Sequence, residues 1–162
     1  MKKIFMILLI LAFIPVVSNA NGIGLVGGYP GGVVFRLDMG ETSGLDFYFN
    51  YYWTSDFGIA ADYVFKKYTM LGEFPIQIFY GAGVSLQFYT WEEWVYDGTY
   101  YWSGHYETTT HIYPGIRGKF GVSYFFEDTP WEIFIETGPA LFFGEYIDTF
   151  NFAGGAGFRY RF

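Results

Sequence analysis

The 162-residue sequence contains no cysteine and few charged residues. Only 15% of the residues are Asp, Glu, Lys or Arg, whereas 25% are aromatic. The missing cysteines exclude a disulfide framework and any zinc site built on thiolates. The low charge and the many aromatic residues exclude an intrinsically disordered chain. Nine basic residues against 16 acidic ones argue against a nucleic-acid partner.

Long hydrophobic runs are also missing. No segment after residue 20 has the 18 or more apolar residues that indicate a transmembrane helix. Glycine and aromatic residues are abundant instead, with 22 Gly, 20 Phe, 16 Tyr and 5 Trp. This composition is typical of strand-rich proteins in which backbones approach closely. The length predicts a single domain.

The first 20 residues have the pattern of a secretory signal peptide. Lys2 and Lys3 precede the apolar segment 4–17, and small residues follow in Ser18-Asn19-Ala20. The apolar segment has 14 residues, fewer than the roughly 20 that span a bilayer. We therefore expect cleavage before Asn21, the alternative being an uncleaved membrane anchor. Removing Lys2 and Lys3 leaves seven basic and 16 acidic residues, a net charge of −9.

Residues 21–162 predict eight β-strands, because large apolar residues alternate with small or polar residues at a period of two. The predicted strands are 22–29, 32–39, 45–53, 56–66, 74–88, 116–126, 131–143 and 152–162. Their lengths are near the roughly 10 residues of a barrel strand that crosses a bilayer. Short joins at 40–44, 68–73 and 127–130 alternate with connections that include one long segment, 91–110. This pattern predicts an up-and-down meander.

The period alone does not say which face of the strands points inward. A soluble barrel would place the apolar face inside and the charged face in water. The polar face, however, carries eleven glycines and about eleven charges over eight strands, a sparse coat for a soluble surface. Small and selected polar residues suit the lumen of an eight-stranded barrel, and large apolar residues suit lipid. We therefore predict an all-β, closed, antiparallel eight-stranded transmembrane barrel in a bacterial outer membrane, with both termini in the periplasm.

The C-terminus and three segments resemble known barrels. Phe158, Tyr160 and Phe162 resemble the terminal signature that the outer-membrane assembly machinery recognises, the alternative being an ordinary edge strand that ends in Phe. The other segments are Gly27-Gly28-Tyr29-Pro30-Gly31-Gly32-Val33, Pro130-Trp131-Glu132-Ile133-Phe134-Ile135-Glu136 with Gly138-Pro139, and Gly155 to Phe162. With these, residues 21–162 resemble small eight-stranded outer-membrane barrels such as OmpX and the transmembrane domain of OmpA. The resemblance implies the fold and the location, and it brings no agreed activity.

The predicted lumen carries charges of both signs. The inward charged residues are Arg36, Lys66, Arg117, Lys119, Arg159 and Arg161 against Asp38, Asp46, Asp62, Glu132 and Glu136. Charges in a narrow lumen must be paired or hydrated. We expect a network centred on Glu136 that joins Glu132 to Arg117, Lys119, Arg159 and Arg161, with Glu136 opposite Arg161 and Lys119 diagonal to it. The alternative is a wet, narrow channel for small solutes.

The long segment 91–110 is the candidate surface-binding element. Its candidate binding residues are Trp94, Tyr96, Tyr100, Tyr101, Trp102 and Tyr106. Trp and Tyr concentrate at recognition sites, and Asp97-Gly98 predicts a turn in a hairpin that prolongs its two strands. Two interpretations of this segment stay open. The favoured one is an aromatic belt at the lipid headgroups with an inert hairpin, and the other is a surface element that binds a host or envelope protein.

Enzymatic chemistry has little support in the sequence. His105 and His111 lie near acidic residues, as a metal site requires, and Ser103-Gly104-His105 resembles a hydrolase pair. Proximity in sequence supplies neither converging ligands nor an orienting third group. We therefore expect no enzyme activity, no cofactor and no metal, and a structural or surface-interaction role. A lipid-modifying enzyme is the third alternative.

Overall fold

The computed structural model describes residues 21–52, 56–96, 104–144 and 149–162, so the predicted signal peptide lies outside the described residues. These residues form strands joined by short turns. The strands are β1 Gly22–Tyr29, β2 Gly31–Asp38, β3 Ser43–Tyr52, β4 Asp56–Leu71, β5 Phe74–Tyr96, β6 Gly104–Phe125, β7 Trp131–Phe142 and β8 Thr149–Arg161. In these ranges no helix is long and apolar enough to cross a membrane.

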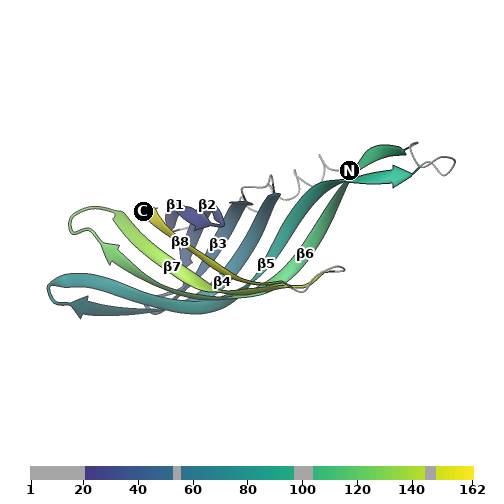
Figure 1. Cartoon of the computed structure of the whole chain (residues 1–162). Coiled ribbons are helices and arrows are strands. Elements are labelled where there is room, and N and C mark those ends of the chain that lie inside the picture. The colour runs from purple at the N-terminus through teal and green to yellow at the C-terminus, as the bar shows by residue number, and fades with distance from the viewer. Residues whose placement is uncertain (1–20, 53–55, 97–103, 145–148) are drawn as a thin grey trace.

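The strands form a closed barrel in which each pairs with its sequence neighbours (Figure 1). All pairs are antiparallel, and β1 closes the barrel on β8 from Gly22 opposite Arg161 to Tyr29 opposite Gly154. Closure gives the first and last strands a partner on both edges, which removes the two open edges that a flat sheet would have. The prediction of a closed, antiparallel eight-stranded meander is confirmed.

The two ends of the barrel differ. Both Asn21 and Phe162 lie at one end, where the backbone N–H of Phe162 donates to the Asn21 carbonyl. The connections 39–42, 72–73 and 126–130 lie at this end, which we call the turn end. At the other end β5 and β6 continue past the barrel as a two-stranded ribbon (Figure 1). The ribbon comprises residues 89–96 and 104–113.

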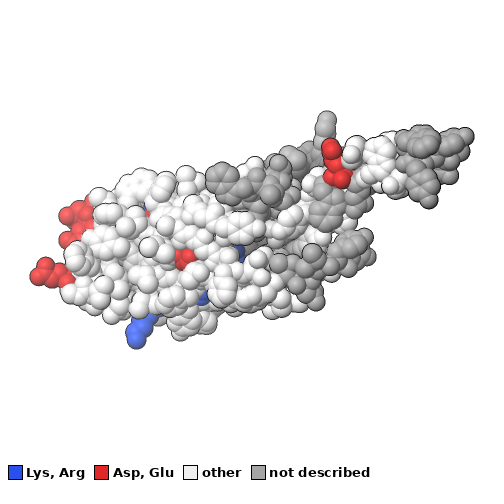
Figure 2. Space-filling model, viewed as in Figure 1, with Lys and Arg blue, Asp and Glu red and all other residues white. Residues whose placement is uncertain are grey.

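The alternation of side chains places the apolar residues outside and the charged residues inside. Along β7, for example, Ile133 and Ile135 are exposed, whereas Glu132, Phe134 and Glu136 are buried. The visible outer surface is accordingly almost free of charge, and acidic residues gather at the turn end (Figure 2). The barrel is therefore apolar on its outer surface and ionic along its axis.

The lumen also contains large apolar side chains, which the alternation of apolar and polar residues does not predict. Phe79 and Phe134 are buried inside the barrel with Val26, Val34 and Tyr48. Glycines on neighbouring strands make room for these rings. A Cβ at Gly121 would meet the Phe79 ring and, at 2.6 Å, the carbonyl oxygen of Ile135. Gly121 therefore leaves space inside the barrel that the Phe79 ring fills.

Substitution of Gly121 tests this packing. We expect Gly121→Ala to lower the free energy of unfolding by about 1–3 kcal/mol, because the added methyl group overpacks the lumen against Phe79. Urea unfolding of the detergent-folded chain measures the change. Gly27→Ala is the matched control, since a Cβ there faces outward and has its nearest neighbour at an ordinary 3.8 Å. Equal stability of the two variants would contradict this account of the packing.

Candidate functional site: the ion-pair network of the lumen

The Asp46 carboxylate is the point at which charges from three strands meet. Arg36 lies directly opposite Asp46 on the neighbouring strand. Its guanidinium donates two hydrogen bonds of 2.6 Å, from Nε to Oδ1 and from Nη2 to Oδ2. Lys119 reaches the same carboxylate from β6, with Nζ 2.6 Å from Oδ2. Both oxygens of this fully buried side chain are thus bound by cations.

A second carboxylate, Asp62, lies directly opposite Asp46 on β4. Two like charges in facing positions destabilise a sheet. Lys119 offsets the repulsion, because its Nζ lies 2.6 Å from Asp46 and 3.8 Å from Asp62. The lysine therefore holds two carboxylates together that the strand register forces to face each other.

Arg117 binds Asp62 from two strands away. Its Nη2 lies 3.0 Å from Asp62 Oδ2. The strand between them contributes Gly83, which pairs with Asp62 on one side and with Arg117 on the other. A Cβ at Gly83 would collide with Asp62. The glycine thus opens the path that the arginine side chain takes.

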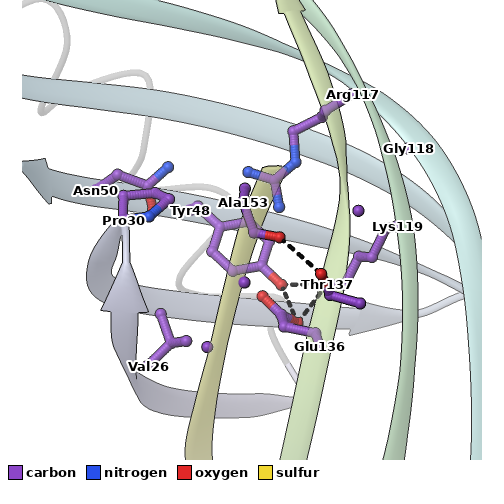
Figure 3. A pocket seen from close by; sticks show the side chains of 13 residues that line it. Val26, Pro30, Tyr48, Asn50, Arg117, Gly118, Lys119, Glu136, Thr137 and Ala153 are labelled. Carbon is purple, nitrogen blue, oxygen red and sulfur yellow. Dashed lines mark hydrogen bonds and ion pairs between the residues drawn. The ribbon is translucent and has the colours of Figure 1, made fainter. Parts of the chain in front are cut away.

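Tyr48 connects this cluster to Glu136, as Figure 3 shows. The Tyr48 hydroxyl donates to Glu136 Oε2 at 2.8 Å and accepts a hydrogen bond from Lys119. Lys119 Nζ also lies 3.1 Å from Glu136 Oε2. The guanidinium of Arg117 stacks over the Tyr48 ring, 4.8 Å from its centre. Tyr48 lies on the predicted polar face, but the sequence did not indicate that it would join the charged groups.

A third pair, Glu132 and Arg159, lies nearer the turn end. The two residues face each other across β7 and β8, with Arg159 Nη1 3.0 Å from Glu132 Oε1. Arg36 lies 3.7 Å from the same carboxylate and so links this pair to Asp46. The Arg159 guanidinium also stacks on Phe134, 4.7 Å from the ring centre. Cations inside the barrel therefore contact aromatic rings as well as carboxylates.

Arg161 occupies a different place from the one that we predicted. Glu136 faces Gly155, six residues before Arg161, so the predicted pairing of Glu136 with Arg161 is wrong. β7 runs to Phe142 and pairs there with Thr149, and this register places Gly155 opposite Glu136. Arg161 instead lies at the turn end, 3.5 Å from Asp38, and is partly exposed. Lys66 binds the same Asp38 at 2.7 Å.

The charges of the central network balance. Four cations, Arg36, Arg117, Lys119 and Arg159, face four anions, Asp46, Asp62, Glu132 and Glu136. Two cavities beside this network, both lined by Arg117, have volumes of about 20 Å³ each. A cavity of this size holds about one water molecule. Paired charges therefore occupy the axis of the barrel, and the two cavities beside them are small.

The ribbon is the second candidate site. Its strands pair with each other as far as Tyr96 opposite Gly104, so they extend as the hairpin interpretation expected. At about 3.3 Å per residue, residues 89–96 span roughly 25 Å along β5. Trp94 and Tyr106 face each other with ring centres 4.9 Å apart. The predicted turn at Asp97-Gly98 and the candidates Tyr100, Tyr101 and Trp102 lie outside the described residues.

The histidines do not assemble a metal site with described side chains. His105 faces Val95 and His111 faces Tyr89, at positions six residues apart on β6. No group of three His, Asp or Glu side chains able to hold a metal ion occurs in the part of the chain that the structure describes. Ser103 lies outside that part, so the Ser103-Gly104-His105 hypothesis has no geometry to support it.

Comparison with known proteins supports the fold. No family model and no curated protein matches the sequence. Among solved structures, the chain is similar to the N-terminal β-barrel domain of Pseudomonas aeruginosa OprF, with a TM-score of 0.55 and 15% sequence identity. The match covers 89% of this chain and 98% of that domain. At this identity the similarity establishes a shared eight-stranded barrel fold.

Removing Lys119 tests the network. We expect Lys119→Met to lower the free energy of unfolding by about 3–5 kcal/mol, because it leaves buried carboxylates without their shared cation. Unfolding in urea, followed by the gel shift between folded and unfolded chain, measures the loss. Lys67→Met removes the same charge from an exposed position on β4 and serves as the control. A similar stability for both variants would show that the lumen charges are hydrated independently.

Proposed function

We propose that this chain is an integral outer-membrane β-barrel protein whose lumen is closed by the ion-pair network and whose ribbon forms a surface for interaction. The observation that carries the proposal is the inverted distribution of side chains. Among the described residues, 33 large hydrophobic side chains are exposed on the surface, whereas the central ion pairs are buried. Soluble monomers rarely expose apolar patches larger than a few hundred Å².

Lipid supplies the environment that this outer surface needs. The outer band of exposed apolar residues contains a groove of about 590 Å³ lined by apolar residues such as Ala61, Val84 and Ile116. In water this apolar lining would be hydrated at a cost in free energy, whereas in a bilayer acyl chains fill the groove. Aromatic residues lie at the turn end of the band, where Trp131 and Tyr160 contact each other with ring centres 5.1 Å apart. Aromatic girdles of this kind occur at the headgroup level of membrane barrels.

The orientation follows from the lengths of the connections. Barrels of the outer membrane have short periplasmic turns and longer outer loops. On this basis the turn end, with both termini, faces the periplasm and the ribbon projects from the cell. Phe158, Tyr160 and Phe162 then form the C-terminal signal for the assembly machinery, and all three point outward. A cleaved signal peptide at residues 1–20 brings the chain to the periplasm.

The sealed axis favours a structural or surface-binding role over transport. Tyr48, Lys119 and Glu136 meet across the lumen, and their hydrogen bonds tie β3, β6 and β7 together. An eight-stranded barrel has room for side chains only, not for a broad pore. The protruding ribbon then remains as the part of the molecule that meets other molecules.

A charge on the outer band distinguishes a membrane barrel from a soluble one. We expect Ile135→Arg to destabilise the barrel in lipid bilayers by about 2–4 kcal/mol, because the arginine must enter hydrocarbon. Folding into vesicles, scored by the heat-dependent shift in gel migration, measures the effect. Thr129→Arg, in an exposed turn, is the control. A wild-type chain that stays dissolved in periplasmic extract without detergent, with full β-structure, would refute the proposal.

Conductance in planar bilayers tests whether the lumen is closed. We expect the wild-type protein to form no stable nanosiemens channel, because the network fills the axis. Tyr48→Ala should raise the conductance by opening space beside Lys119, whereas Tyr51→Ala, an outward tyrosine on the same strand, should not. Stable channels in the wild-type protein would favour the alternative of a narrow solute channel.

A further inference from the structure

The ribbon is acidic and has no Lys or Arg along its described strands. Residues 89–96 and 104–113 contain Glu92, Glu93 and Glu107 but no Lys or Arg. All seven basic residues of 21–162 lie instead in the barrel wall. A surface of one sign raises the local concentration of oppositely charged molecules. We therefore expect the ribbon to attract positively charged molecules.

One face of the ribbon combines a carboxylate with exposed aromatic rings. Glu92 and Trp94 lie two residues apart on β5, so they share this face. Their partners on β6 are Thr108 and Tyr106, which places Tyr106 beside both. The Trp94 ring also contacts Tyr96, with centres 6.5 Å apart. Trp94 is 40% exposed and Tyr106 is 66% exposed, so ring surface remains open.

A guanidinium group matches both features. Its planar face stacks on Trp and Tyr, and its N–H groups donate to a carboxylate. The lumen of the same protein shows this pairing, where Arg117 stacks on Tyr48 while it binds Asp62. A neutral ligand would use the rings but would leave the Glu92 charge to be desolvated without a partner.

We propose that the Glu92–Trp94–Tyr106 face of the ribbon binds arginine-rich segments of protein or peptide partners. The proposal rests on the proposed function, which places the ribbon outside the membrane. Arginine side chains stack over the exposed rings, and the glutamates supply the long-range attraction. The partner class is thus a cationic polypeptide.

The experiment uses the chain from Asn21 to Phe162, folded in a non-ionic detergent. Calorimetry compares an oligoarginine peptide with the same peptide made of citrulline, which keeps the planar group but has no charge. We expect the arginine peptide to bind at least about tenfold more tightly, and the difference to vanish near about 0.5 M salt, where exposed charges are screened. Equal affinity for both peptides would overturn the proposal.

Two variants locate the binding surface. Trp94→Ala should weaken binding of the arginine peptide by about 3- to 10-fold through the loss of stacking. Glu92→Gln should weaken it by a similar factor and reduce its salt dependence. The matched control is Glu41→Gln, which makes the same charge change at the exposed turn end. The control should bind as the wild type does, and an equal loss there would show that net charge alone attracts the peptide.

Two further measurements complete the test. An uncharged oligosaccharide that binds the wild-type chain more tightly than the arginine peptide would overturn the assignment of a cationic partner. Gel migration before and after heating is recorded on every preparation. A folded, heat-modifiable barrel that ignores the arginine peptide refutes this inference alone, whereas a chain that needs no detergent refutes the proposed function itself.

Discussion

Charges enclosed in a narrow lumen have to be paired or hydrated, and in this barrel the pairing of charges organises the structure. Asp46 and Asp62 face each other because the register of β3 and β4 places them there. Lys119 and Arg36 are drawn to the same point, since an isolated buried carboxylate costs several kcal/mol. The result ties four strands together through their side chains, in addition to the backbone ladder. The ionic axis and the apolar exterior are two consequences of one alternating pattern.

Glycine and aromatic residues make this pairing sterically possible. Gly83 lets Arg117 cross a strand to reach Asp62, and Gly121 accepts the ring of Phe79. Cations stack on Phe79, Phe134 and Tyr48, so the rings contribute to the stability of the charges that surround them. The high glycine and aromatic content thus has a role inside the barrel as well as on its surface. Beyond the barrel, aromatic residues such as Trp94 and Tyr106 leave exposed ring surface on the ribbon.

The period of two was enough to predict the strands, the closed meander and the inward set of charges. It identified the prolonged β5–β6 hairpin from the aromatic segment 91–110. It failed in the register of β7 and β8, where Glu136 faces Gly155 and Arg161 lies at the turn end. The alternation along one strand predicts which face a residue occupies, but it does not predict at which residues the chain turns and therefore which residues of the next strand lie opposite. The sequence also did not predict the inward rings of Phe79 and Phe134. Both residues are apolar but lie on the face that otherwise carries small or polar residues, so their chemical type does not reveal that they point inward.

The sequence by itself determined which residues share a face, since side chains of a strand alternate regardless of what the strand pairs with. It also determined that the charges of the polar face nearly cancel. Only the tertiary structure decided which charge meets which. Lys119 lies 73 residues from Asp46, and their contact at 2.6 Å exists only because closure brings β6 across the lumen from β3. Distances across a barrel depend on the register of every strand between, and no local pattern carries that information.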